Sequence, residues 1–81
     1  MIAKKDAPVR RGWYNTEPIY AWMEPDDYAR MNGGYCINKY GNLWYEVNFA
    51  GTLGWVYSGN VVAHGGIGTL TKTSPQLAIA G

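Results

Sequence analysis

The strongest constraint on the fold is a run of alternating side chains over residues 42–49. The odd positions from 43 to 49 carry Leu, Tyr, Val and Phe, while the even positions from 44 to 48 carry Trp, Glu and Asn. This period of two predicts a strand with one face buried. Turn-forming residues follow at 50–52, and a second apolar run covers 53–57. We therefore predict a β-hairpin over residues 42–57.

The remaining sequence predicts more short strands and no helix. Glycine or proline interrupts each of the remaining long segments of the sequence, and the apolar residues do not recur with the period of a helix. Further strands are expected at residues 9–13, 19–23, 27–31, 35–39 and 61–63. Many short strands joined by frequent turns are typical of an all-β fold, here a small antiparallel barrel.

Two of the expected turns have specific residue chemistry. Pro25 occupies the second position of the segment Glu24-Pro25-Asp26, which favours a type I turn. The segment Asn32-Gly33-Gly34 is rich in turn-forming residues and is expected to separate two strands.

The length of 81 residues allows one small domain and excludes doubly wound nucleotide folds and (β/α)₈ barrels. We divide the chain into an N-terminal arm (1–6), the barrel (7–63) and an extended, Gly/Thr-rich C-terminal tail (64–81). The tail is assigned because its residues are mostly small and only weakly hydrophobic.

Charge and hydropathy exclude several further classes of protein. Seven Lys and Arg nearly cancel six Asp and Glu, so the net charge of +1 disfavours a nucleic-acid binder. There is no long apolar run, so neither a membrane span nor an export signal is expected. The single cysteine cannot form an internal disulfide. Localisation stays undetermined, with the bacterial cytoplasm and a virion both open.

Aromatic residues are the first indication of function. The chain has four Trp, seven Tyr and one Phe, more than the core of so small a domain holds. Some must therefore lie at the surface, where rigid rings often bind ligands. Alternation places Val56 on the core face and both Trp44 and Trp55 on the opposite face. These two rings either line an exposed ligand groove with Tyr57 or only stabilise the sheet through cross-strand contact.

The hairpin motif resembles that of a known family. Residues 44–58 read WYEVNFAGTLGWVYS, which resembles the closing hairpin of the bacterial Src homology 3 domain. Residues 7–10, 19–23 and 27–31 are similar to its earlier strands, so the resemblance covers about residues 7–62. It implies a small antiparallel barrel that binds extended ligands, typically cell-wall peptides or proline-containing segments.

No residue pattern predicts catalysis or a metal site. Cys36 lies in an expected strand and should be buried and inert, while His64 should be a solvated loop residue. Glu24, Asp26 and Asp27 lack the spacing of a Ca²⁺ loop and are expected to form a solvated turn, although an acidic turn can also select basic ligands. We expect no enzyme activity, no cofactor and no metal.

A basic cluster near the N-terminus suggests one further alternative. Lys4, Lys5, Arg10 and Arg11 fall within the first eleven residues, where a basic arm beside aromatic rings could bind single-stranded nucleic acid. The balanced net charge and Asp6 disfavour this alternative, and a solvated terminus is expected instead.

Two functions remain. The first is a non-catalytic recognition module that binds a peptide, cell wall or protein partner through Trp13, Tyr14, Trp44, Trp55 and Tyr57. Extended ligands suit an aromatic groove because they lose little conformational entropy on binding. The second is a structural subunit of a larger assembly, such as a phage virion, in which the tail and the aromatic residues form protein–protein contacts.

Overall fold

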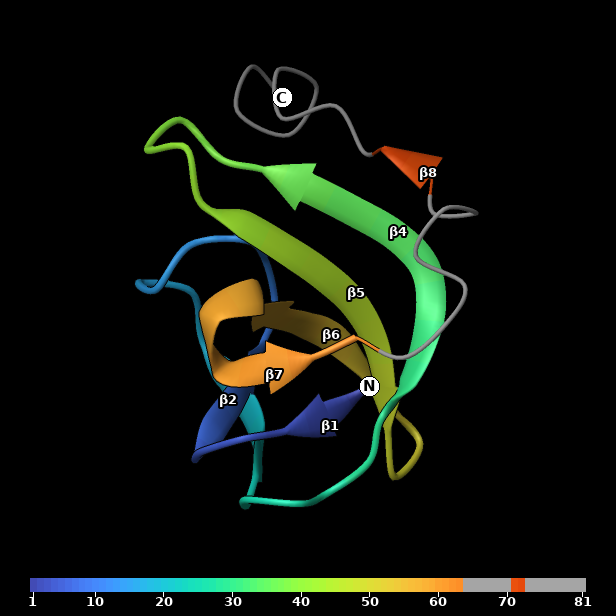
Figure 1. Ribbon diagram of the computed structural model, residues 1–81. Coiled ribbons are helices and arrows are strands. Elements are labelled where there is room, and N and C mark those ends of the chain that lie inside the picture. The colour runs from blue at the N-terminus through green and yellow to red at the C-terminus, as the bar shows by residue number, and fades with distance from the viewer. Residues whose placement is uncertain (64–70, 73–81) are drawn as a thin grey trace.

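The structure is a computed structural model that describes residues 1–63 and 71–72, the latter as backbone (Figure 1). Strands make up most of these residues, and the only helical element among them is one short 3₁₀ turn, η1. The elements are β1 (Ile2–Ala3), β2 (Ala7–Arg10), β3 (Ile19–Met23), β4 (Arg30–Ile37), β5 (Leu43–Phe49), β6 (Thr52–Tyr57), η1 (Ser58–Asn60), β7 (Val61–Val62) and β8 (Thr71–Lys72).

The strands form a small antiparallel β-barrel, as the sequence predicts. The main sheet has the order β3-β2-β6-β5-β4-β8, and β1 pairs with β7 in a second, two-stranded sheet. All pairs are antiparallel except β4 with β8. In Figure 1 the long strands β4 and β5 curve around the short β1–β7 pair. The predicted hairpin is β5–β6, paired from Trp44 opposite Tyr57 to Phe49 opposite Thr52.

The core lies between these two sheets. Val9, Val47 and Val56 are fully buried at its centre, and Met23 and Tyr45 pack beside them. The odd positions of β5 therefore face the core, in agreement with the alternation in the sequence. Each buried aliphatic side chain of this kind stabilises the fold by about 1.5–3 kcal/mol.

The first residues of the chain belong to this core, although the sequence places them in an arm. Met1 and Ala3 are fully buried, because β1 pairs with β7 and covers the open side of the main sheet. The amino group of Met1 donates a hydrogen bond to the Ala29 carbonyl oxygen at 3.1 Å. Burial lowers the pKa of this amino group from its ordinary value of 8.0.

One strand, β4, stands where the sequence predicts two strands at residues 27–31 and 35–39, and it leaves out residues 27–29 and 38–39. The predicted turn at Asn32-Gly33-Gly34 is wrong, because these residues form an irregularity inside β4. Met31 lies opposite Val47 and Tyr35 lies opposite Tyr45, so three residues of β4 span a single residue of β5. Gly33 adopts a positive φ of 94°, which glycine permits without steric cost. The bulge keeps both Met31 and Tyr35 against the core.

The turn after β3 also differs from the predicted type. Asp26 has a φ of 74°, and the Asp27 amide donates to the Glu24 carbonyl oxygen at 2.9 Å. This geometry is a type II turn, not the predicted type I. The flipped central peptide lets the Asp26 amide donate to the Ala3 carbonyl oxygen at 2.7 Å, which ties the turn to β1.

The strand predicted at residues 9–13 and the tail predicted at residues 64–81 can also be compared with the structure. The strand expected at residues 9–13 ends earlier, at Arg10, where the pairing of β2 with β3 shifts register. Of the tail expected over 64–81, only Thr71–Lys72 is described, and it pairs in parallel with β4. His64 and the rest of the tail lie outside the described residues.

The turn between β5 and β6 yields a prediction about stability. Ala50 and Gly51 have φ values of 52° and 85°, which define a two-residue type I′ hairpin turn. Alanine is strained at positive φ, whereas asparagine is well tolerated there. We expect Ala50→Asn to raise the free energy of unfolding by about 0.5–1 kcal/mol, measured by urea denaturation. Gly51→Ala is the matched control and should lower it; an unchanged or lower stability of Ala50→Asn would contradict the assigned turn.

Candidate functional site

The outer face of the hairpin is covered rather than exposed. Trp44 and Trp55 are only 4% and 7% exposed, and they form a second buried cluster with Cys36. Of the two interpretations that the sequence leaves open for Trp44 and Trp55, an exposed strip of both indoles is therefore wrong, whereas the burial of Cys36 is confirmed. Trp13 supplies the cover, because its ring packs edge-on against Trp55 with centroids 5.0 Å apart.

The loop that carries Trp13, residues 11–18, is held in place at both ends. The Arg11 amide donates to the Pro18 carbonyl oxygen at 2.9 Å, and the Glu17 amide donates to the Tyr14 carbonyl oxygen at 3.0 Å. Arg11 Nε and Glu17 Oε1 form an ion pair at 3.0 Å. The Nη1 of Arg10 donates to the Glu17 carbonyl oxygen at 3.0 Å. The loop therefore closes on itself above β6.

Asn38 joins this loop to the turn between β4 and β5. Its Nδ2 donates to the Trp13 carbonyl oxygen at 2.8 Å, and its Oδ1 accepts from the amides of Tyr40 and Asn42 at 3.0 and 3.1 Å. Asn38 is 5% exposed, so this buried amide has partners at both ends. It fixes residues 38–42 beside the loop 11–18.

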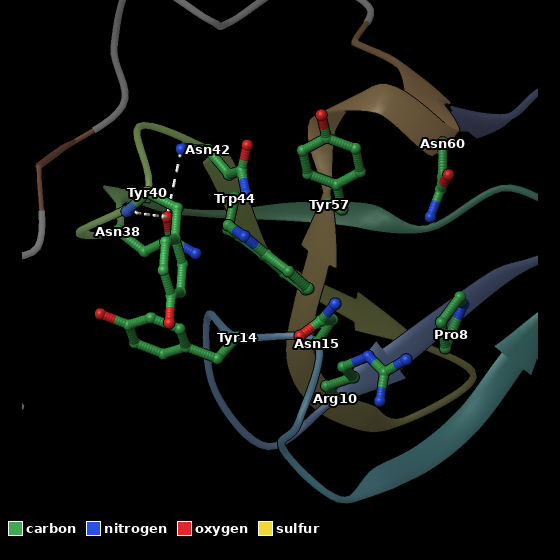
Figure 2. A pocket seen from close by; sticks show the side chains of 10 residues that line it. All are labelled: Pro8, Arg10, Tyr14, Asn15, Asn38, Tyr40, Asn42, Trp44, Tyr57 and Asn60. Carbon is green, nitrogen blue, oxygen red and sulfur yellow. Dashed lines mark hydrogen bonds between the residues drawn. The ribbon is translucent and has the colours of Figure 1, made fainter.

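A cleft lies between the loop 11–18, the turn 38–42 and the end of β6 (Figure 2). Its volume is about 470 Å³. Figure 2 shows Tyr14 and Tyr40 at one end of the cleft and Pro8 and Asn60 at the other. Trp44 and Tyr57 lie between these ends, with Asn15 and Arg10 across from them. The lining is Pro8, Arg10, Tyr14, Asn15, Asn38, Tyr40, Asn42, Trp44, Tyr57 and Asn60.

Two pairs of aromatic rings shape the cleft. Tyr14 and Tyr40 meet edge-on with ring centroids 5.9 Å apart. Trp44 and Tyr57 meet at 5.7 Å with their planes tilted by 50°. Such pairs are worth about 0.5–1.5 kcal/mol beyond the area that they bury, so each ring holds its neighbour in position.

Two lining residues each carry a buried hydrogen-bond donor that has no partner among the residues that the structure describes. The indole Nε1 of Trp44 and the Nε of Arg10 are the buried side-chain nitrogens without a hydrogen-bond acceptor in the described part of the chain. Leaving a buried donor unpaired costs about 1–3 kcal/mol. Both nitrogens belong to residues that line the cleft, but the nitrogens themselves are buried beneath its surface.

The structure brings together only some of the predicted site residues. Tyr14, Trp44 and Tyr57 line the cleft, whereas Trp13 and Trp55 lie behind it and support it. The expected groove is therefore built on a buried tryptophan layer, with Tyr57 at 36% exposure on its rim.

Sequence reasoning missed Pro8, Tyr40 and the four asparagines of the lining, and it considered Arg10 only as part of a basic cluster for nucleic acid. Tyr40 is 69% exposed, and it stands in a turn-rich segment, Asn38-Lys39-Tyr40-Gly41-Asn42. That segment marks a turn in the sequence, but only the folded loop 11–18 brings Tyr14 against Tyr40.

A further exposed tryptophan lies beside the cleft. Trp22 of β3 is 55% exposed and is paired across the strands with Pro8, so the two side chains share the outer face of the sheet. Tyr20 is 51% exposed. The alternation Ile-Tyr-Ala-Trp-Met over β3 was the signal that could have predicted these two exposed rings.

The other candidate groups lie elsewhere or show no site. The acidic turn of Glu24, Asp26 and Asp27 does not line the cleft, and neither do Lys4 and Lys5. Residues 1–63 contain no group of three His, Cys, Asp or Glu side chains that could hold a metal ion. Within the same residues, no helix is both long and apolar enough to cross a membrane.

The chain matches no protein-family model, no curated protein and no solved structure. The fold itself is a small all-β domain, compatible with the barrel of Src homology 3 domains.

The buried tryptophan layer predicts a difference between two aromatic substitutions. Trp55→Ala removes a buried ring and should destabilise the domain by about 3–5 kcal/mol, a large share of the total of about 4–12 kcal/mol expected for this length. Tyr40→Ala removes a ring that is 69% exposed and should change stability by about 1 kcal/mol or less. Guanidinium denaturation followed by circular dichroism measures both; equal losses would contradict the layered arrangement.

Proposed function

We propose that this domain is a non-catalytic recognition module that binds an extended peptide segment in the cleft. The observation that carries the proposal is a cleft lined by two aromatic pairs and by asparagine side chains. Rigid aromatic rings give a large contact area at low entropic cost.

The shape and polarity of the lining favour a peptide as the ligand. Pro8 and the rings of Tyr14, Tyr40 and Tyr57 offer apolar contact, while the side-chain amides of Asn15, Asn42 and Asn60 each offer a donor and an acceptor. Peptide groups present the same pair of functions, so an extended chain can pair with the amides while its side chains pack between the rings.

The family resemblance supports the same proposal. The motif at residues 44–58 is similar to the bacterial Src homology 3 domain, a family whose ligands are extended and include cell-wall peptides. Trp44 and Tyr57 of this motif lie in the cleft. A wall-derived peptide is therefore one source of the proposed ligand.

Binding is tested by selecting ligands from a random dodecapeptide library and from purified bacterial cell walls. We expect Tyr40→Ala and Tyr57→Ala each to weaken binding of the retained peptides by about fivefold to thirtyfold, measured by fluorescence anisotropy. Trp44→Phe, which removes only the N–H and the second ring, should also weaken binding.

The matched control is Tyr28→Ala, because Tyr28 is 63% exposed but does not line the cleft. It should bind like the wild-type domain. Equal affinity of Tyr40→Ala, Tyr57→Ala and the wild type for every retained ligand would contradict the proposal.

A second candidate function rests on a different observation. Strand β3 is an edge strand, its residues Ile19–Met23 carry no charge, and Tyr20 and Trp22 are exposed on it. Uncharged edges with exposed apolar side chains pair readily with another strand. This edge supports the alternative proposal of a structural subunit in a larger assembly, such as a phage virion.

The alternative predicts self-association through β3. Sedimentation of the purified protein should show oligomers whose population grows with concentration, and Trp22→Lys should return them to monomers because a charge on the edge opposes pairing. Tyr28→Lys is the control and should leave the oligomers unchanged. A monomer at every soluble concentration would contradict assembly through this edge.

A further inference from the structure

The cleft has charge of a single sign. Of the described residues that line it, Arg10 is the only one that is charged. A shallower hollow adjoins the cleft, shares Tyr14, Asn15 and Tyr40 with it, and adds Thr16 and Lys39. Among the residues that the structure describes, the combined lining thus holds two cations and no carboxylate.

From this charge distribution we propose that the cleft selects an acidic extended peptide and that a carboxylate of the ligand binds Arg10. The inference rests on the proposed recognition function and adds the chemistry of the ligand. A carboxylate accepts two hydrogen bonds from a guanidinium and neutralises it.

Arg10 is the residue on which the inference depends. It is half-buried, and its Nη1 donates to a neutral group, the Glu17 carbonyl oxygen. Its Nε is buried and has no acceptor among the residues that the structure describes. Within residues 1–63, the one ion pair joins Glu17 to Arg11 instead. Partly buried charges are normally paired, so a guanidinium that lines an aromatic cleft and has no carboxylate partner within residues 1–63 is suited to an anion.

Lys39 places a second positive charge beside the Tyr14–Tyr40 end of the cleft. Its Nζ lies 5.3 Å from the centroid of the Tyr40 ring, within the range of a cation–π contact. The aromatic pair Tyr14–Tyr40 therefore lies between Arg10 and Lys39, and a peptide that crosses this pair meets a cation on either side.

Two acidic side chains, Asp27 and Glu46, form hydrogen bonds away from the cleft. Asp27 accepts from the Glu24 amide at 2.8 Å within the turn beside β1, and Glu46 accepts from Asn32 at 3.0 Å. The idea that the acidic turn selects basic ligands has no geometric support, because none of its residues lines the cleft. An acidic ligand would meet no carboxylate in the lining.

Nucleic acid is the competing anion, and the structure favours a peptide over it. A single strand carries a phosphate at every nucleotide and binds grooves with a continuous row of cations. Here two cations flank the rings, the net charge is only +1, and asparagine amides make up much of the polar lining.

The test compares acidic ligands with their neutral counterparts. A random dodecapeptide library is selected on wild-type domain, on Arg10→Gln and on Lys5→Gln, a control that changes the net charge equally at an exposed site outside the cleft. The wild type and Lys5→Gln should enrich Asp and Glu, and Arg10→Gln should not. Resynthesis of an enriched peptide with Asp→Asn or Glu→Gln should weaken binding to wild type by about tenfold and leave binding to Arg10→Gln nearly unchanged.

Three other outcomes would contradict the proposal, and they distinguish the acidic ligand from the recognition function. Retained peptides without acidic enrichment, or peptides whose Asp→Asn and Glu→Gln forms bind wild type equally well, would overturn the acidic ligand while the recognition function stands. The ligand substitutions need only the wild-type domain, so this result does not depend on the folding of Arg10→Gln. If the wild-type domain retains library peptides no better than a Tyr40→Ala, Tyr57→Ala double variant does, the recognition function itself would be rejected. Binding of labelled oligothymidylate that Arg10→Gln abolishes would overturn the peptide in favour of nucleic acid.

Discussion

Burial of both faces of the β5–β6 hairpin is the constraint on which the rest of the structure depends. On one face Val47 and Val56 pack into the core between the sheets, and on the other Trp44 and Trp55 pack with Cys36. A hairpin alone is only marginally stable in water, and three or more strands or a covering layer are needed. The loop 11–18 provides that layer through Trp13, which is why so short a chain can keep two large indoles inside.

The cleft follows from the same packing. Closing the loop over Trp55 carries Tyr14 to the edge of the tryptophan layer, and Asn38 ties the turn 38–42 to the loop, which sets Tyr40 against Tyr14. Trp44 then forms the floor, and Tyr57 stands on the rim. The rings at the surface are held by rings beneath them, so the site is organised before any ligand arrives. Organisation of this kind lowers the entropic cost of binding.

Local sequence patterns predicted the strands well because period-two alternation depends only on neighbouring residues. Ile19–Met23 has the predicted bounds, and the β5–β6 hairpin has its predicted faces. The site was predicted less well. Alternation places Trp44 and Trp55 away from the core but carries no information on whether another segment covers them. The loop 11–18 has no periodic pattern, so its position over β6, and with it the roles of Arg10 and Tyr40, depends on tertiary contacts. Gly33 misled the strand assignment because glycine at positive φ serves bulges as well as turns.

The relative reactivity of the four tryptophans tests the two-sided burial most directly. Limited oxidation with N-bromosuccinimide, followed by peptide mass spectrometry, gives the rate of modification of each indole in the folded protein. Trp22, at 55% exposure, should react first, Trp13 next, and Trp44 and Trp55, at 4% and 7%, last. Oxidation of Trp44 and Trp55 as fast as Trp22 would contradict the covered hairpin and the cleft that is built on it.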